Sequence, residues 1–141
     1  MKRHASAQWK GDLKTGKGTV STESGVLAES QYSFSTRFED GKGTNPEELI
    51  AAAHAGCFTM ALSGQLGAAN LVAEQLATTA TVTMEKLEAG WTVTGVHLSV
   101  KGKVPKADAA AWEKATAAAK AGCPISRLLN TAITMDAKLE S

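Results

Sequence analysis

A single long helix with almost no charge constrains the fold of this chain more than any other feature of its sequence. Asn45 can cap a helix, and Pro46 suits the first helical position. The next two residues, Glu47 and Glu48, place negative charge in the first turn, where the helix dipole is positive. The pattern predicts a helix that begins here and ends at about Gly67. Because almost no charge follows the first turn, we expect this helix to be buried on most of its sides.

Small side chains occupy two successive turns of the predicted helix. The residues concerned are Ala51, Ala52, Ala53, Ala55 and Gly56. Small residues allow another backbone to approach closely, but they provide little volume for a self-contained core. We therefore expect a second helix to pack against these turns.

The first forty residues are expected to form strands. Three short segments, at 8–10, 18–22 and 32–38, are rich in aromatic and β-branched residues and are separated by Gly, Lys, Ser and Glu. The simplest arrangement of these segments is an antiparallel meander. Alternation along the third strand would place its aromatic residues on one face and Arg37 on the other.

The elements after the long helix follow in a simple order. We expect a hairpin over 81–87 and 91–100, a helix over 109–121, a short helix over 125–129 and a last strand over 133–139. The sequence of β-rich region, helix, β-rich region, helix and strand predicts an α+β fold. We expect residues 1–141 to form a single domain, because a second domain would leave each half too small to bury a useful core.

Composition and charge narrow the classes of function. Hydrophobic residues make up 43% of the chain and charged residues 21%, which is typical of a globular domain. The net charge of +1 and the scattered Lys and Arg residues predict no nucleic-acid partner and no binding to an acidic membrane surface. Polar residues follow the basic start at 1–4, and no run of about eighteen apolar residues occurs, so we expect neither an export signal nor a membrane-spanning helix. The expected location is cytoplasmic.

Two cysteines carry the strongest candidate chemistry. A cysteine acts as a nucleophile through its thiolate, which must be accessible and stabilised by positive charge. Cys123 is expected at the start of the short helix, where amide groups could stabilise it directly. Cys57 lies in the middle of the long helix, where we expect no free amide, so its stabilising charge must come from elsewhere. Arg37 is the candidate cation, and the carboxylate of Glu47 or Glu48 could orient its guanidinium group.

Other interpretations remain open on the residues alone. Each cysteine could be a small buried side chain without reactivity, and their separation of 66 residues forms no diagnostic motif. His54 lies three residues before Cys57 and could act as its base, or it could be a partly buried structural side chain. The cysteines and histidines have none of the short paired spacings of a zinc site, so we expect no metal and no other cofactor.

Several motifs together resemble those of a known family. They are Thr36-Arg37-Phe38, Gly43-Thr44-Asn45-Pro46-Glu47-Glu48-Leu49-Ile50-Ala51-Ala52-Ala53-His54-Ala55-Gly56-Cys57-Phe58 and Ala121-Gly122-Cys123-Pro124. On these residues the chain resembles the family of osmotically inducible protein C and the organic hydroperoxide resistance proteins (OsmC/Ohr). Two further stretches, Trp9-Lys10-Gly11-Asp12 and the residues from Gly16 to Gly25, fit the OsmC branch better than the Ohr branch.

The resemblance implies a fold and a role for each of four residues. Cys57 would be the peroxidatic cysteine and Cys123 the resolving one. Arg37 would activate the thiolate, and Glu47 would be the carboxylate partner of Arg37. The implied fold is α+β, with two β-sheets wrapped around central helices in an intertwined homodimer whose active sites lie at the subunit interface.

The implied activity is that of a thiol-dependent peroxidase for organic hydroperoxides. Cys57 would become a sulfenic acid and release an alcohol, and Cys123 would then close a disulfide. A dithiol reductant, of the lipoyl type rather than glutathione, would reopen the disulfide. Apolar residues near Cys57, namely Phe58, Met60 and Leu62, would favour alkyl hydroperoxides over hydrogen peroxide. The alternatives are a Cys-dependent hydrolase with His54 as its base, and a non-catalytic module that binds a hydrophobic ligand.

Helical geometry bears on how Glu47 could serve Cys57. Ten residues of uninterrupted helix would separate the two by about 15 Å and turn them about 80° apart, which is too far for one arginine to bridge comfortably. Either the helix is broken, or Glu47 serves the cysteine of the other subunit. We favour the second, because antiparallel pairing of two such helices would bring the start of one near the middle of the other.

Overall fold

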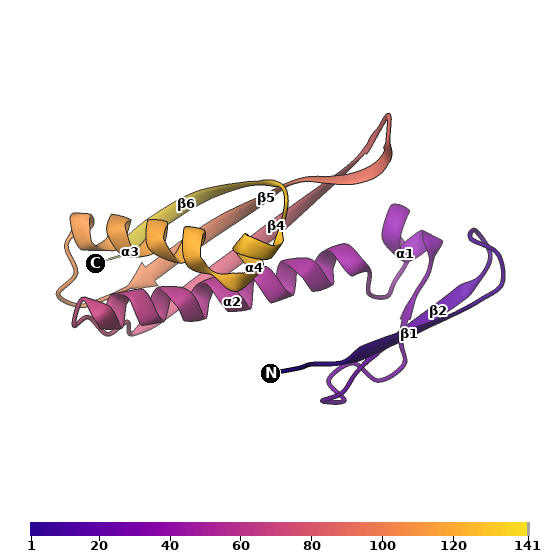
Figure 1. Ribbon diagram of the computed structural model, residues 1–141, viewed down its shortest axis with the longest axis horizontal. Coiled ribbons are helices and arrows are strands. Elements are labelled where there is room, and N and C mark those ends of the chain that lie inside the picture. The colour runs from indigo at the N-terminus through magenta and orange to yellow at the C-terminus, as the bar shows by residue number, and fades with distance from the viewer. Residues whose placement is uncertain (141) are drawn as a thin grey trace. The chain divides into compact units, whose positions relative to one another are not determined.

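The computed structural model describes residues 1–140, and these residues form two compact units. The first unit spans Met1–Leu49, and the second begins at Ile50. The long helix α2, Pro46–Ala68, begins in the first unit and continues into the second. Each unit has its own three-stranded sheet, so the two are described in turn (Figure 1).

The first unit contains a small antiparallel sheet. Its strands are β1 (Ala5–Lys10), β2 (Lys17–Thr22) and β3 (Ser30–Tyr32), paired in the order β1-β2-β3. Gly18 of β2 lies against the rings of Trp9 and Tyr32, and a Cβ atom at this position would collide with both rings. The first two predicted strands are confirmed, and the short helix α1 (Phe34–Phe38) follows the sheet.

The prediction of a strand through the aromatic segment is wrong, because local capping outweighs the alternation of its residues. The Ser33 hydroxyl accepts a hydrogen bond from the Thr36 N–H, and the Thr36 hydroxyl accepts one from the Ser33 N–H. This capping box starts α1 and leaves the rings of Phe34 and Phe38 one turn apart, with centroids separated by 4.9 Å. Arg37 is therefore not remote from the aromatic residues, since its guanidinium carbon lies 5.2 Å from the centre of the Phe38 ring.

The second unit contains a larger, mixed sheet. Strands β4 (Gln75–Leu87) and β5 (Gly90–Lys103) form an antiparallel hairpin, and β6 (Ala132–Glu140) pairs with β5 in parallel. Parallel neighbours require a crossover connection, which here contains helices α3 (Ala109–Gly122) and α4 (Pro124–Leu128). These elements confirm the predicted hairpin, the two predicted helices and the last strand.

One face of this sheet packs against helices to form the core (Figure 1). Alternate residues of β5 point into the core, and α2 and α3 contribute residues three or four positions apart. The main buried residues are Phe58, Leu62 and Leu66 of α2, Val96, Leu98 and Val100 of β5, and Trp112, Ala115 and Ala119 of α3. Asp108 caps α3 as predicted, because its carboxylate accepts a hydrogen bond from the Ala111 N–H. The core thereby holds the helices that carry both cysteines.

Only one stripe of α2 is buried, whereas the sequence predicts burial on most sides. The stripe consists of His54, Phe58, Leu62 and Leu66, at four-residue intervals. Elsewhere on the helix Met60 is 81% exposed, and a Cβ atom at Gly56 or Gly64 would meet nothing within 4 Å. In the described part of the chain, α4 contacts these turns at His54, whereas the small residues Ala52, Ala53 and Gly56 stay exposed, so the expected packing of a second helix on the small residues is not seen.

The length and composition of α2 would also allow it to cross a membrane. It has 23 residues and a mean hydropathy of 1.3 in its apolar window. The sequence analysis predicted no membrane-spanning helix, because it considered only uninterrupted apolar runs. By length and mean hydropathy, α2 differs from that prediction. Core helices of soluble proteins share these properties, and α2 packs its buried stripe into the core of the second unit.

Gly102 of β5 is a position at which the core tolerates no side chain. A Cβ atom there would collide with Cη2 and Cζ3 of the buried Trp112 ring. We expect Gly102→Ala to lower the free energy of unfolding by about 1–3 kcal/mol, because the ring must move within a packed core. Urea unfolding at a fixed protein concentration measures the change. Gly95→Ala on the same strand is the control, since its Cβ would lie 3.5 Å from the Ala132 carbonyl oxygen, and equal losses in both variants would contradict the prediction.

Candidate active site

The fold brings the two cysteines of the chain together. Cys57 lies in the middle of α2, and Cys123 lies at the corner where α3 ends and α4 begins. Their sulfur atoms are 2.7 Å apart, and both are free thiols. Cys123 is 0% exposed, whereas Cys57 is only partly buried. An external reagent therefore meets Cys57 first, and Cys123 is placed to react with the product formed there.

The backbone around Cys123 holds its sulfur at this corner. Its N–H donates a hydrogen bond of 2.9 Å to the Ala119 carbonyl of α3, and its own carbonyl accepts one of 3.0 Å from the Arg127 N–H of α4. Pro124 restricts the residue before it to extended conformations, and Cys123 has φ −54° and ψ 127°. Pro124 also stands at the start of α4, where its missing N–H would have no helical partner. The Cys-Pro sequence thus ends one helix and begins the next.

The environment of Cys57 contains opposing effects on its acidity. Burial raises the pKa of the Cys57 thiol above its ordinary value, and the adjacent Cys123 acts in the same direction. The backbone N–H of Ile125, in the first turn of α4, hydrogen-bonds to the Cys57 sulfur and lowers this pKa. Because the net effect is a raised pKa, the groups of the second unit leave the thiol protonated near neutral pH. A thiolate at Cys57 requires further positive charge.

The placement of the α4 amides corrects two predictions. The sequence predicts that no amide reaches Cys57, whereas the Ile125 N–H does so. It also predicts that the start of α4 stabilises Cys123, whereas the Cys123 side chain makes no capping hydrogen bond. The physical reason is that Pro124 has no N–H, so the first free amide of α4 belongs to Ile125, and this amide is directed at the sulfur on α2.

His54 makes no hydrogen bond to Cys57 among the described residues. Its ring is 0% exposed, and its Nε2 atom lies 2.7 Å from Oγ of Ser126 in α4, while Nδ1 has no hydrogen-bond partner in the described chain. Burial lowers the pKa of His54, so the ring is neutral near neutral pH. The predicted partly buried side chain is therefore fully buried. A Cys-dependent hydrolase with His54 as base would need a contact between ring and sulfur, and the ring instead contacts Ser126.

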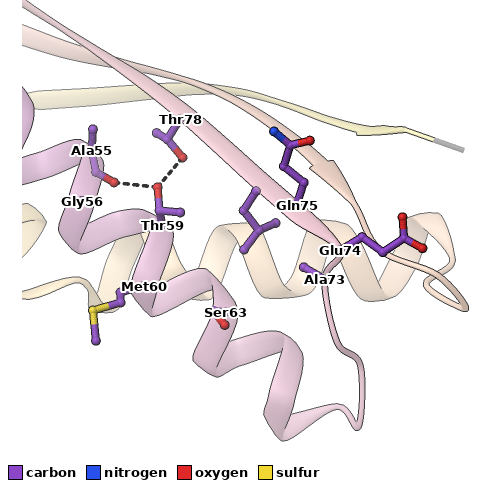
Figure 2. A pocket seen from close by; sticks show the side chains of 10 residues that line it. Ala55, Gly56, Thr59, Met60, Ser63, Ala73, Glu74, Gln75 and Thr78 are labelled. Carbon is purple, nitrogen blue, oxygen red and sulfur yellow. Dashed lines mark hydrogen bonds between the residues drawn. The ribbon is translucent and has the colours of Figure 1, made fainter.

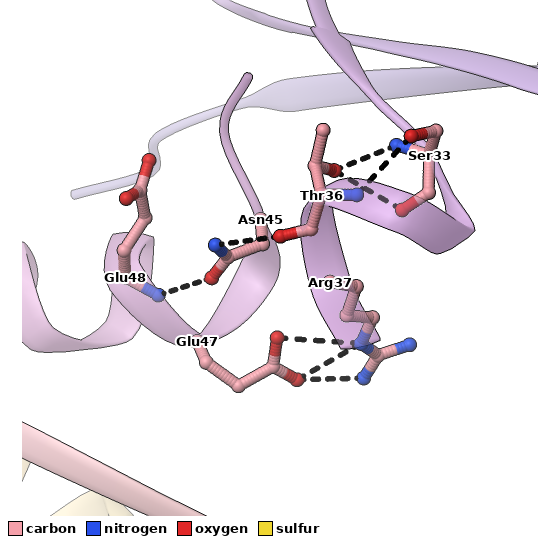
Figure 3. Close-up of polar contacts among 6 residues, drawn as sticks. All are labelled: Ser33, Thr36, Arg37, Asn45, Glu47 and Glu48. Atoms are coloured by element: carbon pink, nitrogen blue, oxygen red, sulfur yellow. Dashed lines mark hydrogen bonds and ion pairs between the residues drawn. The ribbon is translucent and has the colours of Figure 1, made fainter. Parts of the chain in front are cut away.

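Arg37 and Glu47 form an ion pair in the first unit, as Figure 3 shows. The Nε and Nη2 atoms of Arg37 lie 3.0 Å and 2.8 Å from Oε1 of Glu47. The Nη1 atom makes no hydrogen bond to any described residue, so this end of the guanidinium can bind another group. Asn45 joins the two helices that carry the pair, because its side chain donates to the Thr36 carbonyl and accepts from the Glu48 N–H.

A pocket lined by aromatic residues adjoins Arg37. Its volume is about 260 Å³, and its lining consists of Trp9, Leu13, Tyr32, Ser33, Phe34, Arg37 and Phe38. The three apolar residues that the sequence predicts near the substrate do not form such a surface. Phe58 and Leu62 are buried in the core, and Met60 is largely exposed. The apolar surface beside a candidate site residue is therefore this aromatic pocket of the first unit.

The structure groups the four predicted site residues into two pairs. Cys57 contacts Cys123 in the second unit, and Arg37 contacts Glu47 in the first. Among residues 1–140, no group of three or more His, Cys, Asp or Glu side chains is arranged to hold a metal ion. The chemistry that these residues offer is that of two thiols, one cation and one carboxylate.

Three features of the site were missed in the sequence. The sequence could have revealed the Ile125 amide, because Pro124 has no N–H and Ile125 therefore supplies the first free N–H of α4. The sequence also offers a signal for Ser126, because it follows Cys123 by three residues, which is the spacing between His54 and Cys57. The aromatic pocket has no comparable signal, because it depends on a turn of helix where alternation predicts a strand.

The fold and the paired thiols define a dithiol protein on an α+β scaffold with two three-stranded sheets. Within this class, the chain belongs to the family of OsmC-like proteins, whose sequence pattern matches residues 39–138. It is 51% identical to Peroxiredoxin OsmC of Escherichia coli (strain K12) over 139 residues, which cover 99% of this chain and 97% of that protein. The predicted place in the OsmC branch is thereby confirmed.

Solved structures share the fold along almost the whole chain. The organic hydroperoxide resistance protein OhrB of Bacillus subtilis is 25% identical, with a TM-score of 0.72 over 97% of this chain and 98% of that one. An OsmC-like protein of unknown function from Vibrio cholerae is 18% identical, with a TM-score of 0.79 over 97% of this chain and 99% of that one. The predicted α+β OsmC-like fold, with two sheets and central helices, is confirmed.

The buried neutral ring of His54 predicts a loss of stability in mild acid. Its folded-state pKa lies below the value of about 6.5 in the unfolded chain, so the unfolded state takes up a proton first. The stabilisation is complete above that value and is lost as the pH falls toward the folded-state pKa. Urea unfolding should show a loss of up to about 1.4 kcal/mol per pH unit below about pH 6.5, and His54→Gln should reduce this slope. An unchanged slope in the variant would contradict the prediction.

Proposed function

We propose that the protein is a thiol-dependent peroxidase that reduces organic hydroperoxides to alcohols. The observation that carries the proposal is the 2.7 Å separation between a partly accessible sulfur, that of Cys57, and a buried one, that of Cys123. The names of two similar proteins support it: the Escherichia coli relative is a peroxiredoxin, and the Bacillus subtilis structure is an organic hydroperoxide resistance protein.

The proposed reaction has two steps on the protein. In the first, the Cys57 thiolate attacks the terminal oxygen of the hydroperoxide, the O–O bond breaks, and the alkoxide takes up a proton and leaves as the alcohol. Cys57 is then a sulfenic acid. In the second step the Cys123 sulfur attacks the Cys57 sulfur, the S–O bond breaks, and the hydroxyl group leaves as water with the Cys123 thiol proton. The product is a disulfide between the two residues.

Arg37 is the proposed source of the positive charge that Cys57 needs. Burial raises the pKa of Cys57, and the Ile125 amide offsets only part of this effect, so a nearby cation is required for a thiolate. The Nη1 end of Arg37 is free of hydrogen bonds to described residues, while Glu47 holds the opposite edge of the guanidinium. In this role Arg37 would also stabilise the charge that develops on the breaking O–O bond.

The aromatic pocket beside Arg37 supports an organic substrate. Its volume of about 260 Å³ lies below the range of about 300–1,000 Å³ found for pockets that bind drug-sized ligands, so an aryl or short alkyl group would fill it. Hydrogen peroxide has no apolar group to bury there and gains nothing from the pocket. We therefore assign the preference for organic hydroperoxides to this surface rather than to α2.

A small dithiol of the lipoyl type is the proposed reductant. Its first thiolate would attack the exposed side of the disulfide, which is Cys57, because Cys123 is fully buried. The second thiol of the reductant would then attack the resulting mixed disulfide and release the reduced protein. A monothiol such as glutathione cannot make this intramolecular step.

The proposed location is cytoplasmic, where both thiols stay reduced between turnovers. We also propose that residues 1–141 act as one OsmC-like domain, because the family pattern at 39–138 extends across both compact units.

A homodimer is the proposed assembly. In the described chain, no side chain packs against Gly56 or Gly64 of α2, and Met60 is exposed. The exposed side of α2 borders an open groove of about 550 Å³ at the start of β4, shown in Figure 2. The α2 side of this groove carries no charge, whereas Glu74 lines the opposite side. Exposed apolar surfaces mark interaction sites, and a second copy of α2 would supply a matching small-residue surface.

Glu47 and Arg37 are proposed to act across the subunits. The helix α2 has no break between Glu47 and Cys57, so the alternative of a broken helix finds no support. Antiparallel pairing of two α2 helices would bring the start of one helix near the middle of the other. Each active site would then combine the cysteines of one subunit with the ion pair of its partner.

Peroxide consumption by cysteine variants tests the proposed activity. The reduced protein with dihydrolipoate should turn over cumene hydroperoxide with a kcat/KM at least about ten-fold above that for hydrogen peroxide. Cys57→Ser should abolish turnover, because it removes the nucleophile. Cys123→Ser should consume a single equivalent and then stop, with Cys57 oxidised. Full turnover by Cys57→Ser, or sustained turnover by Cys123→Ser with this reductant, would contradict the proposal.

Mixed dimers test the sharing of residues between subunits. Cys57→Ser and Arg37→Ala chains with different affinity tags are co-expressed, and the mixed dimer is purified. If Arg37 acts across the interface, one site of the mixed dimer is complete, and about half of the wild-type activity should return. If Arg37 serves its own chain, neither site is complete. A mixed dimer with no more activity than the Arg37→Ala homodimer would contradict the shared site.

A further inference from the structure

Two side-chain contacts, about one helical turn apart, join α2 to the segment formed by α4 and its N-cap residue Cys123. In the first, the sulfur atoms of Cys57 and Cys123 lie 2.7 Å apart. In the second, Nε2 of His54 lies 2.7 Å from Oγ of Ser126. His54 and Cys57 are three residues apart on α2, and their partners on the facing segment are also three residues apart. Three residues correspond to a rise of about 4.5 Å along a helix. The spacing of the two contacts is therefore matched on α2 and α4.

The order of the contacts shows how the two segments run. The residue number rises from His54 to Cys57 on α2, while it falls from Ser126 to Cys123 on the facing segment. The segments are therefore antiparallel where they meet. In such a pair, a hydrogen bond at one position determines which residues face each other one turn away. The His54 contact thus sets the alignment of the two sulfurs.

We infer that the hydrogen bond between His54 and Ser126 positions Cys123 for disulfide formation with Cys57. Both are positioning residues, since neither touches a reacting atom. The inference deepens the proposed function, on which its biological meaning rests. It names two residues that control the second chemical step, the attack of Cys123 on oxidised Cys57.

One other directional contact joins these segments, from the Ile125 N–H to the Cys57 sulfur, and it involves the reacting sulfur itself. The helix α4 has five residues, too few to be stable without tertiary contacts. The backbone hydrogen bonds of Cys123 tie it to α3 and to α4 itself, not to α2. Ile125 and Leu129 pack against the core, but apolar packing is not directional. In residues 1–140, the His54–Ser126 contact is the one side-chain hydrogen bond between α2 and α4 that does not involve sulfur.

Burial makes this hydrogen bond effective as a positioning device. His54 is 0% exposed and Ser126 is 9% exposed, so water cannot readily replace either partner. Ser126 is also the only group that satisfies the ring, because Nδ1 has no hydrogen-bond partner among the described residues. A shift of α4 along α2 would leave both ring nitrogens buried and unpaired, which is unfavourable. The native alignment is selected over shifted ones.

An aromatic disulfide reagent separates the two thiol steps without any peroxide. With dithiobis(nitrobenzoate), Cys57 thiolate attacks the reagent, forms a mixed disulfide and releases one nitrothiobenzoate anion. Cys123 then attacks the Cys57 sulfur, the protein disulfide forms, and the second anion leaves. The rate of the first release reports access to Cys57 and its ionisation. The rate of the second release reports the positioning of Cys123.

We expect Ser126→Ala to slow the second release by about 10- to 100-fold, because misplacement of a reacting group by about 1 Å has effects of this size. The first release should change much less. Ser126→Thr, which keeps the hydroxyl, should restore the second rate. The double variant of His54→Gln and Ser126→Ala should be no slower than the slower single variant, because both changes remove the same contact.

Thr116→Ala is the matched control for a loss of stability alone. Thr116 is a buried residue of α3 whose hydroxyl donates to the Trp112 carbonyl, away from both cysteines in the hydrogen-bond network. It should leave the second release unchanged. A second release in Ser126→Ala as fast as in the wild type would overturn the inference. So would equal slowing in Thr116→Ala, or failure of Ser126→Thr to restore the rate.

The positioning role and the proposed peroxidase activity can be refuted independently of each other. A wild-type protein that releases both anions but does not reduce hydroperoxides would refute the peroxidase and still allow the comparison of variants. A protein with peroxidase activity and a second release that is insensitive to Ser126→Ala would refute the positioning role alone.

Discussion

The contact between the sulfur atoms of Cys57 and Cys123 is the interaction on which the rest of the structure depends. The two residues are 66 positions apart, and they meet because α2 and the α3–α4 corner pack on one face of the same sheet. Closing so long a loop costs conformational entropy, which burial of the apolar core offsets. The parallel pairing of β6 with β5 returns the chain across this face and places the corner over α2. Fold and chemistry are therefore coupled through a single contact.

The same packing that joins the thiols makes Cys57 less acidic. Burial raises the pKa of Cys57, and the Ile125 amide offsets only part of this effect. On the proposed account, the second unit supplies the nucleophile and the resolving thiol, and its described groups leave the pKa of Cys57 raised. The first unit contains the proposed cation, Arg37, which is held by Glu47 and bordered by an aromatic pocket. The proposed site combines groups of both units, and the proposal of a shared site takes them from two copies of the chain.

Local signals in the sequence were sufficient to predict the start of α2 and most elements of the second unit. Asn45 and Asp108 accept amide hydrogen bonds at the starts of α2 and α3, and both caps are visible as residue types at the expected positions. The failure at α1 is also local, because the capping box between Ser33 and Thr36 competes with aromatic alternation and prevails. The parallel partner of β6 could not be predicted, since its pairing depends on contacts remote in sequence.

For the candidate site, the sequence indicated the residues but not their arrangement. Motif resemblance identified both cysteines, Arg37 and Glu47, but spacing along the chain could not show that the residues form two pairs. The hydrogen bond between His54 and Ser126 was missed because the sequence interpretation treated His54 as a base or a structural side chain on α2 alone. A contact between helices depends on their relative placement, which residue types along one helix do not reveal.

Mass spectrometry of the reduced protein after one equivalent of cumene hydroperoxide tests the central claim most directly. The account predicts a mass lower by two hydrogen atoms and a proteolytic peptide that links Cys57 to Cys123 within one chain. A protein that consumes the peroxide and leaves Cys123 free to alkylate, with Cys57 carrying added oxygen and no bridge, would contradict it.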